Sequence, residues 1–268
     1  MAKNKKTKQE LVSIVIPVYN AERFLEDTIR TVQEQTYENW ELLLINDCST
    51  DNSKKIAEKY LNSKIKWIDM ENNCGAALTR NKGIELSNGR YICFLDADDL
   101  WNKDKLKKQV AFMIENKCEF SFTGYEFADE KGIPNGKKVY VPKTINYRQA
   151  LKNTTIWTST VMFDMKKISK EIIMLPNVKS EDTACWWKVL KTIKCAYGLN
   201  EILSFYRRTS GTLSSNKFEA IKRIWNLYVN VEKLNYFYSF YCFCWYVFNA
   251  IKRRVWGVIN ENKKGKRK

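Results

Sequence analysis

The sequence predicts an α/β protein with a mostly parallel central sheet and helices on both faces of that sheet. Over the first 120 of the 268 residues, short apolar runs of β-type residues alternate with amphipathic stretches of helical periodicity. Strands that alternate with helices in this way form parallel sheets, whose two faces are both covered by helices. Hydrophobic residues make up 44% of the chain, so a chain of this length can bury a core.

The strands and helices of this first part can be assigned in order. Pro17 ends the first apolar run, and each amphipathic stretch has its apolar residues three and four positions apart. Asn88 and Gly89 form a turn before the last strand. The expected strands are 11–18, 42–45, 65–70 and 91–95, and the expected helices between them are 21–35, 51–60 and 75–87.

After residue 125 the pattern is less regular. Residues 157–164 and 203–208 are predicted to be strands, and residues 181–193 a helix that begins with Glu181 and Asp182. Acidic side chains stabilise the positive N-terminal end of a helix, and this alone would account for the two acids. Trp186 and Trp187 on the same helix are expected to pack in the core rather than on a ligand.

The C-terminal residues 217–268 have a different composition. Residues 217–234 are amphipathic, and residues 234–251 carry no charge and are half aromatic. Eighteen uncharged residues are near the lower limit for a membrane span, but Tyr and Trp favour the headgroup region. We therefore expect helices and a basic tail that associate with the membrane surface. The alternatives are a membrane span, packing against the rest of the chain, and a homodimer contact.

The positive charge is concentrated at the two ends of the chain. The net charge is +16, of which residues 1–8 contribute +4 and residues 252–268 contribute +7, leaving +5 for the other 243 residues. A nucleic-acid-binding protein needs a basic face on its folded domain. We therefore expect no nucleic-acid partner, and we interpret residues 1–10 as a basic tail.

The chain contains no histidine and has eight scattered cysteines. The absence of histidine excludes Ser-His-Asp and Cys-His catalysis and the HExxH zinc site. Carboxylates must then supply both the proton transfer and any metal ligands. The cysteines form no CxxC pair and the Lys-rich N-terminus does not resemble a signal peptide, so we expect a reducing, cytosolic compartment.

Polar clusters follow each of the four predicted strands. They are Tyr19-Asn20, Asn46-Asp47, Asn72-Asn73 and Asp96–Asp99. In parallel sheets ligands bind beyond the carboxyl ends of the strands, so these clusters predict one binding site. Asp96 and Asp98 form a DxD motif, in which one carboxylate can face a sugar and the other can bind Mn²⁺ or Mg²⁺ together with substrate phosphates.

Five segments in this order resemble the motifs of family 2 glycosyltransferases. They are IVIPVYN (14–20), INDCSTDNS (45–53), NNCGAALTRNKGI (72–84), GRYICFLDADDLW (89–101) and SEDTACWW (180–187). The resemblance covers residues 11–216 and implies the GT-A fold, with a nucleotide-binding half (11–100) and an acceptor half (101–216). It is strongest to bacterial enzymes that build cell-surface polysaccharides on a lipid carrier.

The resemblance implies a role for most of these polar residues. Asp47 would accept a hydrogen bond from the uracil imide, Asp96 would contact the ribose or the donor sugar, and Asp98 would bind Mn²⁺ or Mg²⁺ at the diphosphate. The nucleotide-sugar would be held by Pro17, Tyr19, Asn20, Asp47, Asn73, Gly75, Arg80, Asp96 and Arg207.

The remaining implied roles belong to the second half of the chain. Asp182 would be the general base, and Glu181 would help to hold the acceptor. Arg207 would belong to a loop that closes near the diphosphate together with Ser210, Thr212 and Ser214. Residues 158–160 lie either in the acceptor cleft or in an ordinary strand, and Cys74 has no assigned role.

The sequence therefore predicts an inverting, metal-dependent transferase that moves a sugar from a UDP-sugar to a lipid-linked saccharide. It would act at the cytoplasmic face of the cell membrane as a peripheral protein. The alternatives are a nucleotidylyltransferase, whose Gly-rich loop after the first strand is missing from residues 17–24, and a non-enzymatic module that binds anionic lipid or nucleic acid. The sugar, the linkage and the oligomeric state are not determined by the sequence.

Overall fold

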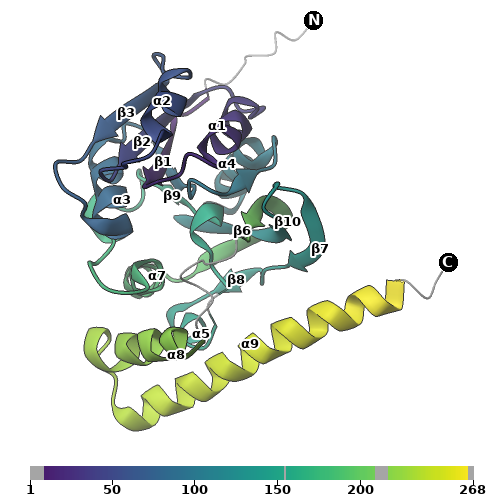
Figure 1. Cartoon of the computed structure of the whole chain (residues 1–268). Helices are drawn as coiled ribbons and strands as arrows, with labels where there is room; N and C mark the ends of the chain where they lie inside the picture. Colours follow the sequence, from purple (N-terminus) through teal and green to yellow (C-terminus); the bar gives the residue numbers. More distant parts are fainter. Residues whose placement is uncertain (1–8, 154, 209–216, 265–268) are drawn as a thin grey trace, which may run out of the picture.

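A single ten-stranded sheet lies at the centre of the protein (Figure 1). The computed structural model describes residues 9–153, 155–208 and 217–264, with side chains for all of these except 217–218 and 252–264. The strands are β1 Val12–Val18, β2 Trp40–Asn46, β3 Ile65–Asp69, β4 Tyr91–Phe94, β5 Leu100–Trp101, β6 Phe120–Ala128, β7 Pro134–Val139, β8 Thr144–Ile145, β9 Met162–Asp164 and β10 Ala196–Arg207.

The helices of the described residues alternate with the strands in the first half and gather at the C-terminus. They are α1 Leu25–Gln33, α2 Ser53–Glu58, α3 Gly75–Leu86, α4 Lys105–Asn116, α5 Tyr147–Ala150, α6 Lys170–Ile173, α7 Glu181–Thr192, α8 Lys217–Asn226 and α9 Tyr236–Lys264, with a 3₁₀ turn η1 at Thr158–Thr160 and a π turn η3 at Leu227–Val231.

The sheet has a parallel half and a mixed half. Its strand order is β3-β2-β1-β4-β9-β6-β10-β5, with β7 beside β6 and β8 beside β10. The first four strands are parallel, and β9 pairs antiparallel with both β4 and β6. The predicted α/β class is confirmed, and the parallel arrangement predicted for the first four strands is present.

Alternate residues of β1 point to opposite faces of the sheet, as they must in a strand. Ile14 and Ile16 pack with buried residues of α1, α2 and α4 in one cluster. Val15 packs in the other cluster with residues of α3 and α7. The helices therefore cover both faces, as predicted, and the site residues described below lie at the carboxyl ends of the strands between these two layers.

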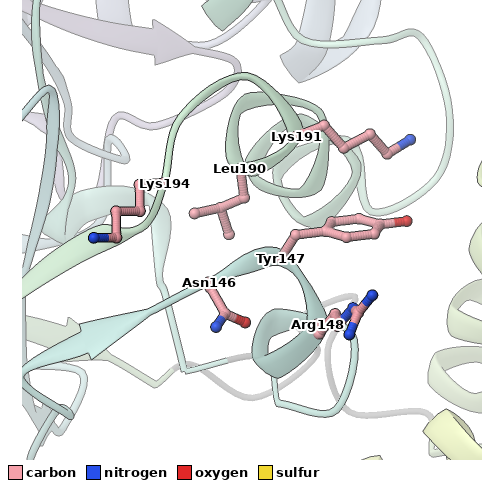
Figure 2. Close-up of a pocket in the computed structure, with 6 residues that line it drawn as sticks. All are labelled: Asn146, Tyr147, Arg148, Leu190, Lys191 and Lys194. Carbon is pink, nitrogen blue, oxygen red and sulfur yellow. The ribbon is translucent and has the colours of Figure 1, made fainter.

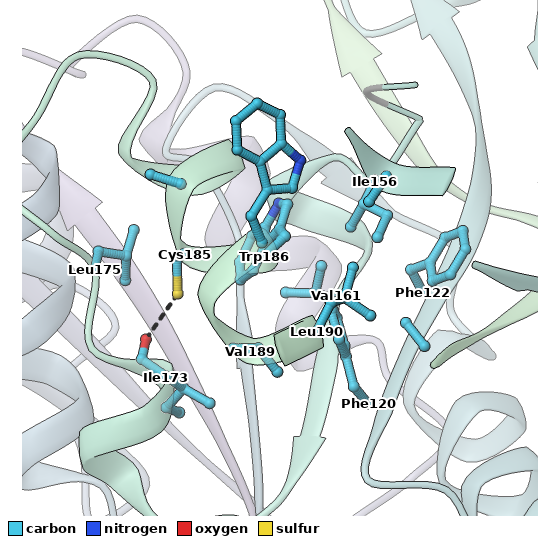
Figure 3. Close-up of a cluster of buried hydrophobic side chains, with 14 of the residues drawn as sticks. Phe120, Phe122, Ile156, Val161, Ile173, Leu175, Cys185, Trp186, Val189 and Leu190 are labelled. Atoms are coloured by element: carbon cyan, nitrogen blue, oxygen red, sulfur yellow. Dashed lines mark hydrogen bonds between the residues drawn. The ribbon is translucent and has the colours of Figure 1, made fainter. Parts of the chain in front are cut away.

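The α7 layer is built on aromatic packing (Figure 3). The Trp186 ring lies 5.7 Å from that of Phe120 and 6.3 Å from that of Phe94, measured between centroids. Trp187 stacks on Tyr228 of η3 at 5.2 Å, and Cys185 Sγ donates to the carbonyl of Ile173 at 3.2 Å. Both tryptophans are buried, which confirms that they are core residues.

The prediction of a strand over 157–164 is only partly correct. Residues 158–160 form η1, and the strand β9 begins at Met162. Two carbonyls of this turn accept hydrogen bonds from side chains instead of from a strand backbone: Ser159 O accepts from Trp101 Nε1 and Ser204 Oγ, and Thr160 O accepts from Gln109 Nε2. The alternation of polar residues here resembles a strand, but tertiary hydrogen bonds hold a turn.

The C-terminal helices also differ in detail from the prediction. The amphipathic stretch 217–234 is divided into α8 and η3, and Lys233 has a positive φ of 52° that ends this segment. The aromatic stretch begins a helix that runs well beyond residue 251, into the basic end of the chain. Among the described helices, none has the combined length and apolarity that crossing a membrane requires.

The burial of Trp186 provides a test of the α7 packing. Trp186 is 3% exposed, so Trp186→Ala should lower the free energy of unfolding by about 3–5 kcal/mol in urea denaturation. The control is Trp245→Ala in α9, where the side chain is 43% exposed and the expected loss is below about 1 kcal/mol. Equal losses in the two variants would contradict this account of the core.

Candidate active site

Asp47, at the end of the β2 strand, orients the start of α3. Its Oδ1 accepts the N–H of Cys74 at 2.7 Å and its Oδ2 accepts the N–H of Gly75 at 2.9 Å. A carboxylate is favourable at the positive end of a helix, and Gly75 has a φ of +80° that favours glycine. Cys74 therefore contributes its main-chain N–H to the loop. Each carboxylate oxygen of Asp47 keeps a second acceptor position, so a further hydrogen bond from uracil can be accepted there. That contact stays a prediction.

The loops after β1 and β2 are joined through Asn20. Asn20 has a φ of 48°, a conformation that Asn tolerates better than most residues. Its N–H donates to Ser49 Oγ at 3.1 Å, and its Oδ1 accepts the N–H of Thr50 at 2.8 Å. Tyr19 is 56% exposed beside it, and Pro17 lies within β1. Asn73 donates to the carbonyl of Asp47, so the residues predicted to bind the nucleotide lie in loops that are joined by hydrogen bonds.

Arg80 joins the two halves of the predicted site. Its Nη2 donates to Asp96 Oδ1 at 2.6 Å, and its Nη1 donates to Glu181 Oε1 at 2.9 Å. The Arg80 side chain is only 7% exposed, and these carboxylates hold the pKa of the guanidinium above its ordinary value despite burial. The next residue, Asn81, donates to and accepts from the main chain of Leu175. Helix α3 thus contacts both the end of β4 and the start of α7.

Asp182 follows Glu181 in the first turn of α7. Burial, and then the charge of Glu181, raises the pKa of Asp182. Thr158 Oγ1 lies 3.4 Å from Asp182 Oδ2 as a hydrogen-bond donor. One member of the 158–160 segment therefore contacts the predicted base, and the segment is a turn rather than an ordinary strand.

Two residues to which the sequence analysis gave no individual role, Ser159 and Asp99, support the DxD segment through hydrogen bonds. Ser159 Oγ donates to Asp99 Oδ2 at 2.7 Å and accepts the N–H of Asp96 at 3.1 Å. Asp99 Oδ1 accepts the N–H of Arg207 at 3.3 Å. Both side chains are fully buried, and burial together with the charges of Asp98 and Asp96 holds the pKa of Asp99 well above its ordinary value. Asp99 follows the motif directly and Ser159 belongs to the polar run 158–160, but no pattern in the sequence pairs these two residues.

Arg207 is buried beneath the same segment. Its Nε donates to the carbonyl of Asp98 at 2.9 Å, its Nη1 to the carbonyl of Glu130, and its Nη2 to Asp27 Oδ2 at 3.2 Å. In this arrangement the guanidinium supports the backbone of the DxD segment. Its predicted contact with a diphosphate stays a prediction, and Ser210, Thr212 and Ser214 of the same predicted loop lie outside the described residues.

Asp98 has the carboxylate that is best suited to a cation. Within the described residues, no side-chain nitrogen of Lys or Arg lies within 4.0 Å of the Asp98 carboxylate oxygens. Burial, and then the charge of Asp96, raises the pKa of Asp98 to about 6. The described part of the chain has no group of three or more His, Cys, Asp or Glu side chains arranged to hold a metal ion. Asp98 therefore fits Mn²⁺ or Mg²⁺ only as part of a shell completed by substrate oxygens and water.

A separate hollow of about 490 Å³ lies between α5 and the C-terminal end of α7 (Figure 2). It is lined by Asn146, Tyr147, Arg148, Leu190, Lys191 and Lys194. Lys191 is about 15 Å from Glu181 along the helix axis, at 1.5 Å per residue. None of the predicted site residues lines this hollow, so we do not assign the transfer reaction to it.

The crowding of carboxylates around Asp98 provides a second test. The raised pKa means that the metal-free protein loses stability as the pH rises from 3.8 to about 6. Asp98→Asn should therefore raise the free energy of unfolding in urea by about 1–3 kcal/mol at pH 7.5. This gain should shrink as the pH falls from 6 to 4, whereas Glu58→Gln, at an exposed position on α2, should show no such gain. A destabilised Asp98→Asn protein at pH 7.5 would contradict the charge balance described here.

Comparison with known sequences places this geometry in a family. The family model described as "Glycosyl transferase family 2" matches residues 13–173. The Bacillus subtilis protein named "Putative teichuronic acid biosynthesis glycosyltransferase TuaG" is 42% identical over 91% of this chain and 98% of its own length. The Escherichia coli protein named UDP-Glc:alpha-D-GlcNAc-diphosphoundecaprenol beta-1,3-glucosyltransferase WfgD is 37% identical over 81% of this chain and 85% of its own.

Solved structures show the same fold. Residues 1–349 of Staphylococcus aureus TarS, in complex with UDP-GlcNAc, align with 82% of this chain and 66% of that chain, at a TM-score of 0.66 and 22% identity. The mannosyltransferase PcManGT of Pyrobaculum calidifontis, in complex with GDP-Man and Mn²⁺, aligns with 85% of this chain and 66% of that chain, at a TM-score of 0.66 and 15% identity. This chain thus spans about two thirds of each structure. With a GT-A fold and a family match over most of its length, the chain belongs to glycosyltransferase family 2 and is a glycosyltransferase.

Proposed function

We propose that this glycosyltransferase moves a sugar from a UDP-sugar to a lipid-linked saccharide, with inversion at the sugar carbon and with a divalent metal. The observation that carries the proposal is the Arg80 bridge between Asp96 and Glu181. It fixes the first carboxylate of the DxD motif and the first turn of α7 at the two ends of one guanidinium. This is the arrangement that a displacement needs, with the leaving group on one side and the base on the other.

The DxD side of the site suits the diphosphate leaving group. Asp98 would hold Mn²⁺ or Mg²⁺, which when bound neutralises the charge that develops on the leaving oxygen. Asp96, held by Arg80, would face the ribose or the donor sugar. Asp47, Asn20 and Tyr19 would border the base. The Mn²⁺ in PcManGT and the UDP-GlcNAc in TarS support these assignments by fold alone.

The α7 side suits activation of the acceptor. Asp182 Oδ would take the proton of the acceptor hydroxyl as its oxygen forms the new bond to the sugar carbon. The bond from that carbon to the diphosphate oxygen breaks on the opposite side, and its electron pair leaves with UDP. Because attack and departure are in line, an α-linked donor gives a β-linked product. The name of WfgD states a β-1,3 linkage for that enzyme, and also an α-D-GlcNAc-diphosphoundecaprenol acceptor.

The test of the reaction uses a panel of UDP-sugars and a synthetic polyprenyl-diphosphate saccharide. Asp182→Asn should retain binding of the UDP-sugar in calorimetry and lose transfer by about 10²–10⁴-fold, because only proton transfer is removed. Asp98→Asn should lose the Mn²⁺-dependent part of UDP binding. The proton NMR spectrum of the wild-type product should show a β-linkage. Wild-type turnover in Asp182→Asn, or an α-linked product, would refute the mechanism.

The raised pKa of Asp182 predicts a pH profile. A base works only when deprotonated, so kcat/KM should rise with pH as Asp182 loses its proton. Part of the raised pKa comes from the charge of Glu181, so Glu181→Gln should move this acid limb to lower pH.

The matched control for this profile is Glu85→Gln, at an exposed position on α3. It should leave the acid limb where it is in the wild type. An acid limb that stays in place, or moves upward, in Glu181→Gln would remove Asp182 as the titrating base.

A further inference from the structure

Helix α9 has one face that packs on the domain. Ser239 and Cys242 are fully buried, and Tyr238, Phe243 and Tyr246 pack against the cluster that also contains residues of α3 and α7. Asn249 Nδ2 donates to the carbonyl of Lys152 at 3.0 Å. These contacts fix the rotation of the helix about its own axis.

Most of the opposite face of α9 is exposed in the described part of the chain, although Lys152 Nζ donates to Tyr241 Oη at 3.2 Å and lies over the Tyr241 ring. Its large side chains form an arc about 140° wide at 100° per residue, which we call the aromatic stripe. Phe237 is 91% exposed and Phe240 61% exposed, and the other members are about half exposed. The aromatic stripe consists of Phe237, Phe240, Tyr241, Trp245, Phe248 and Ile251. Contiguous apolar surfaces of this kind mark interaction sites in proteins that are otherwise polar outside.

We propose that the aromatic stripe docks on an anionic membrane surface, with α9 lying in the plane of the interface. Tyr and Trp are enriched in the headgroup region, because their rings bury apolar area while their polar atoms stay hydrated. The members of the stripe recur every three or four residues, which is the spacing of a helix that lies on a membrane rather than across it. This inference rests on the contacts of α9 and not on the transfer reaction.

Charge favours lipid over a second copy of the chain as the occupant. Residues 252–268 follow the stripe directly and carry eight basic residues and one acid. Such a segment is attracted to the negative surface of an anionic leaflet. If two copies paired through parallel α9 helices, the two segments of +7 would be brought together and would repel each other.

The structure also narrows the membrane-associating segment predicted from the sequence. Ile224, Leu227 and Tyr228 of α8 and η3 are buried against the domain, and Tyr228 donates to the carbonyl of Leu151. Among the described side chains of α8, η3 and α9, the exposed aromatic ones all belong to α9. Helix α9 packs on the same side of the sheet as α7 (Figure 1). The membrane and Asp182, the predicted general base, would therefore lie on the same side of the sheet.

The experiment measures sedimentation of the full chain with sucrose-loaded vesicles. Wild-type protein should pellet with vesicles of 30% phosphatidylglycerol in phosphatidylcholine and much less with phosphatidylcholine alone. The stripe variant Phe237→Ser/Phe240→Ser/Phe248→Ser should lower partitioning on the order of 30-fold, from the loss of buried aromatic area. Circular dichroism and thermal unfolding establish that the variant is folded.

The matched control removes three exposed apolar side chains elsewhere, as Leu61→Ser/Leu86→Ser/Ile114→Ser. It should pellet like the wild type. The proposal is overturned if wild-type protein does not bind the anionic vesicles, or if the stripe variant binds them as well as the control does. It is also overturned if light scattering shows that the stripe variant converts a dimer into a monomer with vesicle binding unchanged. None of these outcomes depends on transferase activity, so they are distinct from failure of the proposed reaction.

Discussion

The buried guanidinium of Arg80 is the contact on which the geometry of the site depends. A charge that is 7% exposed must be paired, and Arg80 finds its partners on two elements that are far apart in the sequence. Asp96 ends the parallel half of the sheet, and Glu181 begins the helix that carries the predicted base. If either carboxylate were removed, a buried charge would lose a partner, so α3, β4 and α7 hold each other in one arrangement.

The DxD segment is held from two directions. Arg80 pairs with the Asp96 carboxylate from the α3 side, and Ser159 and Arg207 bond the backbone and Asp99 from the other side. The result is a short segment with three carboxylates and little freedom to move. Burial, and then the repulsion between close carboxylates, raises the pKa values of Asp98 and Asp99. The protein accepts this cost in stability at the position where a cation would be useful, as functional sites commonly do.

The insertion of β9 between β4 and β6 explains how the two halves share one site. Since β9 pairs with β4, the η1 turn that precedes it lies directly behind the DxD segment. Ser159 can then support Asp96 while Thr158 reaches Asp182. Family membership favours the transferase over the nucleotidylyltransferase and over a non-enzymatic binding module.

The sequence by itself determined the fold class, the order of the first four strands and helices, and the residues at the carboxyl ends of those strands. These follow from periodicity and local turn chemistry, which act over a few neighbouring residues. The Arg80 bridge, the support of Asp99 by Ser159, the turn at 158–160 and the buried position of Arg207 depended on the tertiary structure. Each of them joins residues far apart in the chain, and which partner a buried polar group finds depends on how the elements pack. The rotation of α9, which leaves its aromatic stripe outside, was decided in the same way by its contacts with the domain.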